Sequence, residues 1–344
     1  MNDAKLPIAV VGCGAVAAGH YLPSIAASRR LEATLLVDRD AARARALAAR
    51  WRVPRTATEI GEVARHARAA VVALPNALHA PVTIELLRAG VHVLVEKPMA
   101  TSAADCDAMA AAARGSGARL AVGLQFRYFD STRWVADALR GGMLGALRRF
   151  DLRLGVVSRW PFASDYFLRR ETAGGGVLTD YGAHVLDLLC LWLGDFAPPR
   201  YRDDARGGVE SDCEIGLVSL AGVPGTVEIS RTRNLRNTCR FEGDAATLEV
   251  GIWDPDPPIE IWRPGEPRRL VARAREAGER GLDFNGAFLR SLDDFAAAIA
   301  SGAETQVPAS EGRRAVALIE SCYAAAEPLV LPWQHPPQLE EGRG

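Results

Sequence analysis

A short apolar run followed at once by closely spaced glycines is the feature of this sequence that most restricts its fold. Residues 8–11 (I-A-V-V) are typical of a strand buried on both faces of a parallel sheet. Gly12 and Gly14 follow, with the small Ala17 in the third place of a G-x-G-x-x-[G/A] pattern. The glycines permit a tight strand-to-helix turn and close approach of a pyrophosphate, and the small third residue lets the helix pack on its strand. The pattern therefore predicts a dinucleotide-binding turn, with phosphates held at the start of the new helix.

An acidic residue about twenty positions beyond the glycines strengthens this interpretation. A second apolar run ends in Asp38, where a carboxylate would accept hydrogen bonds from an adenosine ribose, and residues 21–30 can form the connecting helix. A chance turn followed by a surface aspartate is the alternative, and the order of strand, glycines, helix, strand and aspartate argues against it. Asp38 favours NAD because it would repel a ribose 2′-phosphate, whereas Arg39 keeps NADP possible.

The composition indicates a globular protein of two domains. A chain of 344 residues exceeds the size of one typical core. Apolar residues make up 49% of the chain and charged residues 24%, which is ordinary for soluble proteins. The 41 basic and 42 acidic residues leave a net charge of −1, so nothing favours a nucleic-acid partner.

The cysteines and the N-terminus favour a reducing compartment. The six cysteines lie far apart, without C-x-x-C or metal-ligand spacing, so we expect reduced thiols and no metal site. No basic and apolar signal sequence opens the chain, and no stretch reaches the length of a membrane span. We therefore expect a cytoplasmic protein without a membrane partner.

The first part of the chain alternates short apolar runs with alanine-rich helical segments. This alternation predicts a doubly wound parallel sheet of the Rossmann type, and hence an α/β fold. The expected strands are 8–11, 31–37, 69–74, 91–95 and 120–124, and the expected helices are 41–50, 60–66, 80–89 and 103–114. We assign residues 1–123 to an NAD(P)-binding domain.

Beyond residue 123, strands follow one another without intervening helices, which predicts an α+β domain with a large, mostly antiparallel sheet. The expected strands are 147–157, 213–220, 226–231, 237–242, 247–250 and 259–262, and the expected helices are 131–140, 179–193, 284–300 and 310–326. We assign residues 124–330 to this domain, which would bind substrate and mediate oligomerisation, and residues 331–344 to a C-terminal tail.

Glu96-Lys97-Pro98 comes directly after the fourth expected strand. In an open α/β sheet, ligands bind beyond the carboxyl ends of the strands, so Lys97 could donate a hydrogen bond to a substrate oxygen there. Pro98 fixes the backbone and could follow a cis bond. The alternative is a solvated lysine at the start of a loop.

Two further groups of polar residues are candidates for chemistry. Asp180 and His184 lie four residues apart just after a glycine triplet, so on a helix the carboxylate could orient an imidazole that takes a proton from an alcohol. The alternative is a helix-capping aspartate and a packed histidine. Asn76 and His79 follow the third expected strand, near the ribose and nicotinamide of a cofactor, unless they only form a turn and a helix cap.

The motifs G-C-G-A-V-A-A-G-H, V-D-R-D, P-N-A-L-H, E-K-P and G-G-G-V-L-T-D-Y-G-A-H resemble, in this order, those of the Gfo/Idh/MocA family of glucose-fructose oxidoreductase-like and inositol dehydrogenase-like enzymes. The resemblance extends from residue 8 to about residue 326. It implies a Rossmann domain and a C-terminal sheet domain that commonly mediates oligomerisation, so we expect a homodimer or homotetramer. It also implies NAD(P)-dependent oxidation or reduction at a carbon of a sugar, cyclitol or nucleotide sugar.

The resemblance extends to individual residues. Catalytic roles fall on Lys97, Asp180 and His184. The expected cofactor-binding residues are Gly12, Cys13, Gly14, Ala15, Val16, Asp38, Arg39, Leu74, Pro75, Asn76, His79, Glu96, Lys97 and Gln125. The expected substrate-binding residues are Lys97, Arg127, Trp160, Tyr166, Arg169, Asp180 and His184. Three members of the last set, Trp160, Tyr166 and Arg169, lie in an expected substrate loop, residues 159–170. The aromatic side chains of this loop could stack on a sugar, and its arginines could hold a phosphate or carboxylate. A folded-over surface loop is the alternative.

The leading hypothesis is an NAD-dependent sugar dehydrogenase or ketoreductase. In it His184 takes the hydroxyl proton, Lys97 stabilises the reacting oxygen, and Asp180 orients His184. One alternative is an NAD-dependent glycosidase, which oxidises a sugar transiently, eliminates the aglycone and reduces the product again. Another is a dinucleotide-sensing regulator, and the complete set of three candidate catalytic residues counts against it.

Overall fold

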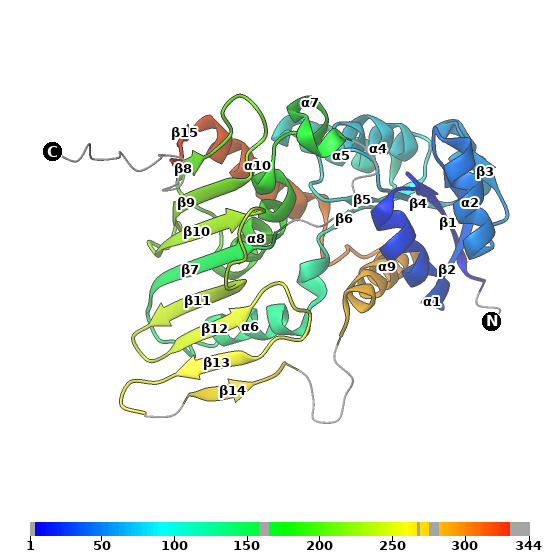
Figure 1. The fold of residues 1–344 in the computed structure, drawn as a ribbon. Coiled ribbons are helices and arrows are strands. Elements are labelled where there is room, and N and C mark those ends of the chain that lie inside the picture. The colour runs from blue at the N-terminus through cyan, green and yellow to red at the C-terminus, as the bar shows by residue number, and fades with distance from the viewer. Residues whose placement is uncertain (1–3, 158–164, 267–268, 275–281, 331–344) are drawn as a thin grey trace, which may run out of the picture.

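In the computed structural model, residues 4–157, 165–266, 269–274 and 282–330 are described, and they form two sheets that lie beside each other (Figure 1). The first sheet has the strand order β3-β2-β1-β4-β5-β6, and every neighbouring pair is parallel. Its strands are β1 (Leu6–Val11), β2 (Leu31–Val37), β3 (Thr56–Ala57), β4 (Ala69–Val72), β5 (His92–Glu96) and β6 (Leu120–Gly123). This order confirms the predicted Rossmann domain, in which a dinucleotide binds where the winding direction reverses.

Alternate residues of β1 explain why helices pack on both faces of this sheet. Ile8 and Val10 lie in one core cluster and Ala9 and Val11 in another, because successive side chains of a strand point to opposite faces. The first cluster includes side chains of α1 (Leu22–Ala27) and α2 (Ala41–Trp51), and the second includes side chains of α4 (His79–Arg88) and α5 (Ala103–Ser116).

The helix after β1 begins differently from the expected helix 21–30. A π-helical turn, η1 (Ala17–Tyr21), precedes α1, which ends at Ala27. Tyr21 is fully buried, so its hydroxyl lies inside the protein beneath the edge of the sheet. The predicted helix 60–66 likewise begins as a 3-10 turn, η2 (Ile60–Glu62), before α3 (Val63–His66).

The second sheet has nine strands in the order β14-β13-β12-β11-β7-β10-β9-β8-β15. They are β7 (Leu147–Gly155), β8 (Arg200–Asp203), β9 (Asp212–Val218), β10 (Pro224–Ser230), β11 (Thr238–Gly243), β12 (Thr247–Gly251), β13 (Ile259–Trp262), β14 (Leu270–Ala272) and β15 (Ala326–Pro328). Two pairs, β7 with β10 and β8 with β15, are parallel and the others antiparallel, as expected for a mostly antiparallel sheet.

Four short strands did not appear in the sequence analysis: β3, β8, β14 and β15. They contain two to four residues, too few for a period of two to stand out. The expected helix 310–326 ends at Ala324, because Ala326–Pro328 pairs with β8.

Helices connect the two sheets. The long helix α8 (Val177–Leu193) packs on β9 and β10, and α10 (Ala309–Ala324) packs against both α8 and α5. On the far side, α9 (Phe284–Ser301) returns to the first sheet, where Phe288, Leu292 and Phe295 join the cluster around Ile8. Helix α6 (Asp130–Arg140) completes the second domain next to α8 (Figure 1).

One segment differs from the expectation that no stretch is long and apolar enough to span a membrane. Residues Arg170–Leu193 meet that length and composition, but 78% of the apolar window is buried inside the protein. Since α8 packs on the sheet and on α10, we interpret it as a core helix. All six cysteines are buried free thiols.

Candidate active site

The glycine turn has the geometry of a pyrophosphate-binding loop. Gly12 has φ +96°, and a Cβ atom there would overlap the carbonyl of Ala73, so the turn requires glycine at this position. A Cβ at Gly14 would meet nothing within 4 Å, which leaves the outer side of the turn open. The N–H of Ala18 donates to the carbonyl of Gly14 at 3.0 Å, so the helix starts here and its first N–H groups have no intrahelical acceptor. These features fit a bound dinucleotide.

Asp38 holds this turn in place. Its Oδ2 accepts a hydrogen bond from the N–H of Cys13 at 2.8 Å, and its Oδ1 accepts one from the N–H of Asp40 at 2.9 Å. The carboxylate is 8% exposed, so it lies beside the turn where an adenosine ribose would bind. Arg39 is exposed next to it, and an Nη of Arg43 lies 3.8 Å from its Oδ2.

A buried polar network links the glycine helix to the E-K-P segment. Oε1 of Glu96 accepts hydrogen bonds from the hydroxyl of Tyr21 at 2.6 Å and from the amide of Gln125 at 3.0 Å, and Oε2 accepts one from the N–H of Lys97. Gly123 leaves the space for this network, because a Cβ there would lie 2.8 Å from the Tyr21 hydroxyl. Burial raises the pKa of Glu96, and the charge of Lys97 opposes that rise. Glu96 and Gln125 therefore hold the backbone of Lys97 in place through this buried network.

Lys97 and Asp180 form an ion pair between the two domains. Nζ of Lys97 lies 2.6 Å from Oδ1 of Asp180 and 3.1 Å from its carbonyl oxygen. The side chains are 17% and 28% exposed, so the pair is partly accessible to solvent. The Lys97–Pro98 peptide is cis. The carboxyl edge of β5 and the first turn of α8 thus present one cation and one anion at the same point.

The imidazole of His184 lies on the same helix but does not pair with Asp180. No described residue hydrogen-bonds its buried Nδ1, and its ring stacks on Phe126 instead, with centroids 4.2 Å apart. Burial, followed by the charge of Lys97, holds the pKa of His184 well below its usual range. Asp180 therefore does not hydrogen-bond His184 as expected, because its carboxylate pairs with the ammonium of Lys97.

The loop after β4, which contains Leu74 and Pro75, is tied to the second domain. The amide of Asn76 donates a hydrogen bond to the carbonyl of Ala173 at 2.7 Å. Asn76 is 8% exposed, so its side chain connects the domains rather than projecting into solvent.

His79 has a structural place in this loop. Its Nδ1 lies 2.8 Å from the carbonyl oxygen of Pro98 and its Nε2 lies 2.9 Å from that of Leu74. The ring is fully buried, and burial lowers its pKa. His79 thus holds two loops of the site together, and neither ring nitrogen remains available for the ribose or nicotinamide contact that we expected.

The expected substrate loop is described only in part. Trp160 lies outside the described residues. Tyr166 is half-buried, and burial together with the negative charges of Asp180 and Glu96 raises its pKa. Tyr166 therefore remains a candidate substrate contact.

The two expected substrate arginines are both paired with carboxylates. Arg169 is exposed and forms an ion pair with Asp165. Arg127 is buried: its Nε and Nη2 bind the carboxylate of Asp187 at 2.8 and 2.6 Å, and Nη2 also lies 2.6 Å from Glu311. Its guanidinium pairs with carboxylates of α8 and α10, which argues against the expected substrate contact of Arg127.

An aromatic cluster around His184 was missed by the sequence analysis. Trp253 lies edge-on to Phe126 at 6.0 Å and to Tyr181 at 5.4 Å, and Phe284 lies 6.2 Å from Trp253. These side chains come from four separate segments, so no spacing in the sequence brings them together. In the described residues, no group of three His, Cys, Asp or Glu side chains gathers to hold a metal ion.

A family model described as "Oxidoreductase family, NAD-binding Rossmann fold" matches residues 6–124, and one described as "Oxidoreductase family, C-terminal alpha/beta domain" matches residues 136–329. A protein of Amycolatopsis mediterranei named as a UDP-kanosamine synthase oxidoreductase subunit is 30% identical over 92% of this chain and 95% of its own length.

Two further similarities come from Actinomadura kijaniata. A dTDP-3,4-didehydro-2,6-dideoxy-alpha-D-glucose 3-reductase is 25% identical over 96% of this chain and 98% of its own length. The crystal structure of a 3-ketoreductase in complex with NADP and TDP-benzene has a TM-score of 0.83 over 96% of this chain and 100% of that one, at 24% identity, which shows a shared fold.

Proposed function

Because this chain belongs to the Gfo/Idh/MocA family of NAD(P)-dependent oxidoreductases, we propose that it transfers a hydride between NAD(P) and a ring carbon of a sugar, with a nucleotide-linked sugar as the favoured substrate class. The relatives named for UDP-kanosamine synthesis and for a dTDP-sugar 3-reductase support this class. A free sugar and a cyclitol are the other substrates to be tested.

The ion pair of Lys97 and Asp180 is the observation that carries the proposal. Lys5 and Lys97 are the only lysines among the 41 basic residues of the chain. A chain that uses arginine at nearly every basic position thus has a lysine beside Asp180, at the carboxyl edge of β5, where a compact ammonium can donate to a single substrate oxygen. A purely structural ion pair could use arginine, whose fork binds a carboxylate more firmly.

Each side chain has a distinct part in the reaction. Bound NAD(P) supplies or accepts the hydride. The Lys97 ammonium donates a hydrogen bond to the reacting oxygen and stabilises its developing negative charge. Asp180 holds that ammonium in place. His184 is neutral near pH 7 because its pKa is lowered, so in the oxidation direction its imidazole accepts the hydroxyl proton, and in reduction its imidazolium returns it.

The two alternative hypotheses gain no support from the relatives described above, which are named as reductases or oxidoreductases. A glycosidase would release an aglycone from a chromogenic glycoside without net NADH formation. A regulator would bind a dinucleotide without any turnover. Both outcomes separate clearly from a dehydrogenase in the assay below.

The test is absorbance of the reduced nicotinamide while sugars, cyclitols and nucleotide sugars are added with NAD or NADP. We expect turnover with one substrate class, and strong loss of turnover in Lys97→Ala but not in Lys5→Ala. Lys5 donates to the carbonyl of Ser28, far from the site in the sequence, and serves as the matched control. Turnover that is equal in both variants would overturn the proposed role of Lys97.

We also propose a cytoplasmic homodimer or homotetramer that associates through the second sheet. Outward-facing side chains of this sheet form cross-strand ion pairs, including Arg149 with Glu242 and Arg202 with Glu214. A contact through this polar face would weaken with salt. Light scattering at low and high ionic strength should show a dimer or tetramer that dissociates at high salt, and a monomer under both conditions would contradict the proposal.

A further inference from the structure

The glycine triplet before α8 is packed against three separate parts of the chain. A Cβ at Gly174, which has φ +81°, would lie 2.8 Å from the methyl group of Thr101. A Cβ at Gly175 would overlap the hydroxyl of Tyr323, and a Cβ at Gly176 would overlap the carbonyl of Glu210. The three glycines thus allow a loop, the last helix and the segment before β9 to meet at the start of α8.

Glu210 satisfies the first N–H groups of α8. Its carboxylate accepts hydrogen bonds at 2.9 Å from the N–H groups of Gly176 and Leu178, and its own carbonyl accepts one from the N–H of Val177. The N-terminal Gly176 has no side chain to cap the helix, so Glu210 supplies the cap from a segment more than thirty residues away. Glu210 is fully buried.

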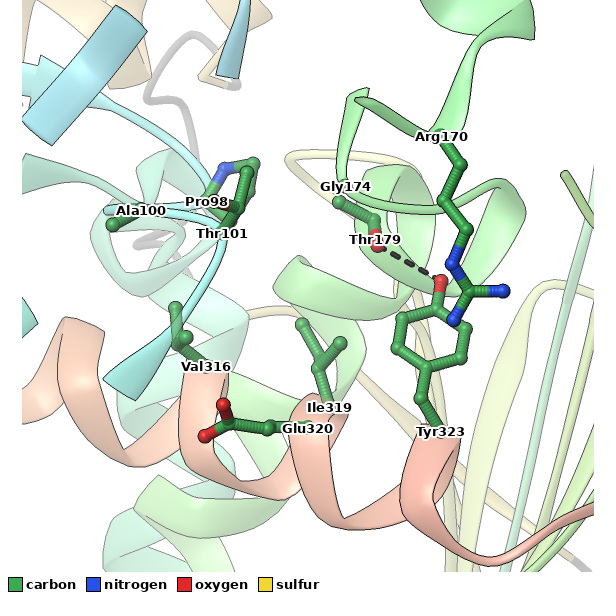
Figure 2. A pocket seen from close by; sticks show the side chains of 10 residues that line it. All are labelled: Pro98, Ala100, Thr101, Arg170, Gly174, Thr179, Val316, Ile319, Glu320 and Tyr323. Atoms are coloured by element: carbon green, nitrogen blue, oxygen red, sulfur yellow. Dashed lines mark hydrogen bonds between the residues drawn. The ribbon is translucent and has the colours of Figure 1, made fainter. Parts of the chain in front are cut away.

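Tyr323 connects this cap to the residue beside Asp180. Its hydroxyl lies 2.8 Å from the Glu210 carboxylate. It also lies 2.8 Å from the hydroxyl of Thr179 (Figure 2). Figure 2 also shows Arg170 against the ring of Tyr323, with its guanidinium carbon 5.0 Å from the ring centroid. The two hydrogen bonds of its hydroxyl and the contact of Arg170 with its ring therefore hold the Tyr323 phenol in place. Tyr323 thus links α10 to the first turn of α8.

This cluster lies behind the catalytic groups. Thr179 and Tyr323 line a cavity of about 200 Å³ together with Pro98 and Thr101, which follow Lys97 in the chain (Figure 2). Neither Glu210 nor Tyr323 hydrogen-bonds Lys97 or His184 in the described structure. Any effect of the cluster on catalysis must therefore pass through the position of α8.

We propose that Glu210 and Tyr323 are positioning residues that fix the first turn of α8 and thereby hold the Asp180 carboxylate against Lys97. The inference rests on the proposed function for its effect on turnover. Its structural part, the anchoring of the first turn of α8, can be measured without any substrate.

The experiment compares Tyr323→Phe with Tyr201→Phe. Tyr201 is a fully buried tyrosine whose ring lies edge-on to Tyr323 at 5.8 Å, but its hydroxyl bonds neither Glu210 nor Thr179 in the described structure. Tyr201→Phe removes a neighbouring buried hydroxyl that has no hydrogen-bond partner in the described structure, so it controls for loss of the hydroxyl group without loss of its hydrogen bonds. We expect faster amide hydrogen exchange over residues 176–180 only in Tyr323→Phe, with kcat about tenfold lower and an unchanged Kd for the reduced nicotinamide.

A second pair of variants tests the carboxylate. Glu210→Gln keeps an oxygen that can accept from the N–H groups of α8, whereas Glu210→Ala does not. We expect Glu210→Gln to recover a large part of the kcat that Glu210→Ala loses. Equal losses of kcat in these two variants would contradict the capping role.

The failure of this inference differs from failure of the proposed function. If exchange over residues 176–180 and kcat are both unchanged in Tyr323→Phe while Lys97→Ala is inactive, the positioning role is overturned and the oxidoreductase proposal stands. If Lys97→Ala stays as active as the wild type, the proposed function fails, and the exchange measurement still decides whether the cluster anchors α8.

Discussion

The imidazole of His184 stacks on the ring of Phe126, with centroids 4.2 Å and planes 12° apart, and this contact buries the ring beside Lys97. A buried imidazole loses the hydration that favours its charged form, and the ammonium of Lys97 disfavours that form further. A lowered pKa means that the neutral base persists to lower pH than for an exposed histidine. His184 is therefore suited to accept a proton near neutral pH.

We predict that kcat/KM for sugar oxidation stays constant from about pH 8 to below 6.5, the usual pKa of histidine, and falls only at lower pH. Phe126→Ala should expose the imidazole and move this acidic limb up toward 6.5. Phe129→Ala is the control, because it removes another buried ring of the same cluster. The ring of Phe129 stacks on that of Phe126. An acidic limb at the same pH in both variants would show that the stack does not control the pKa of His184.

Lys97→Ala should lower turnover by about two to four orders of magnitude, because it removes the ammonium proposed to stabilise the reacting oxygen. The affinity for the reduced nicotinamide should change little, since the glycine turn and Asp38 lie elsewhere on the sheet edge. Lys97→Arg should not restore turnover, because a planar guanidinium cannot occupy the place of a compact ammonium. Fluorescence titration and steady-state kinetics measure the two effects separately, and a parallel loss of cofactor affinity would contradict this division.

The sequence was sufficient to predict the strands that carry the site and the two motifs that meet in it. Lys97 was predictable because it follows the end of a buried strand, and Asp180 because it follows a glycine triplet. The structure brings the two side chains into contact. The structural contacts of Arg127 and His79 could not be predicted, for a common reason. Their partners, such as Glu311 for Arg127 and Pro98 for His79, are set by packing between distant segments, which leaves no periodic pattern in the sequence.

Arg127→Met tests the corrected role of this arginine. The buried guanidinium binds Asp187 and Glu311. Its loss leaves the buried carboxylate of Asp187 without its partner, whereas Glu311 keeps Arg314, and we expect the free energy of unfolding to fall by about 3–5 kcal/mol. Arg149→Met is the control, because the solvent-exposed pair of Arg149 with Glu242 should contribute little to stability. Urea denaturation measures both losses. A raised KM with unchanged stability in Arg127→Met would instead restore a role in substrate binding.

Asp38→Ser should raise the use of NADP relative to NAD. The carboxylate lies beside the glycine turn, and its charge would repel a ribose 2′-phosphate. Without that charge, Arg39 and Arg43 would attract the phosphate. The ratio of kcat/KM for NADP to that for NAD should rise at least about tenfold, which corresponds to roughly 1.4 kcal/mol. Asp40→Ser is the matched control. It removes a carboxylate from the same turn, but one that caps α2, a task that serine also performs. The ratio should stay unchanged in that control, and an equal shift in both variants would mean that net charge, not the position of Asp38, selects the cofactor.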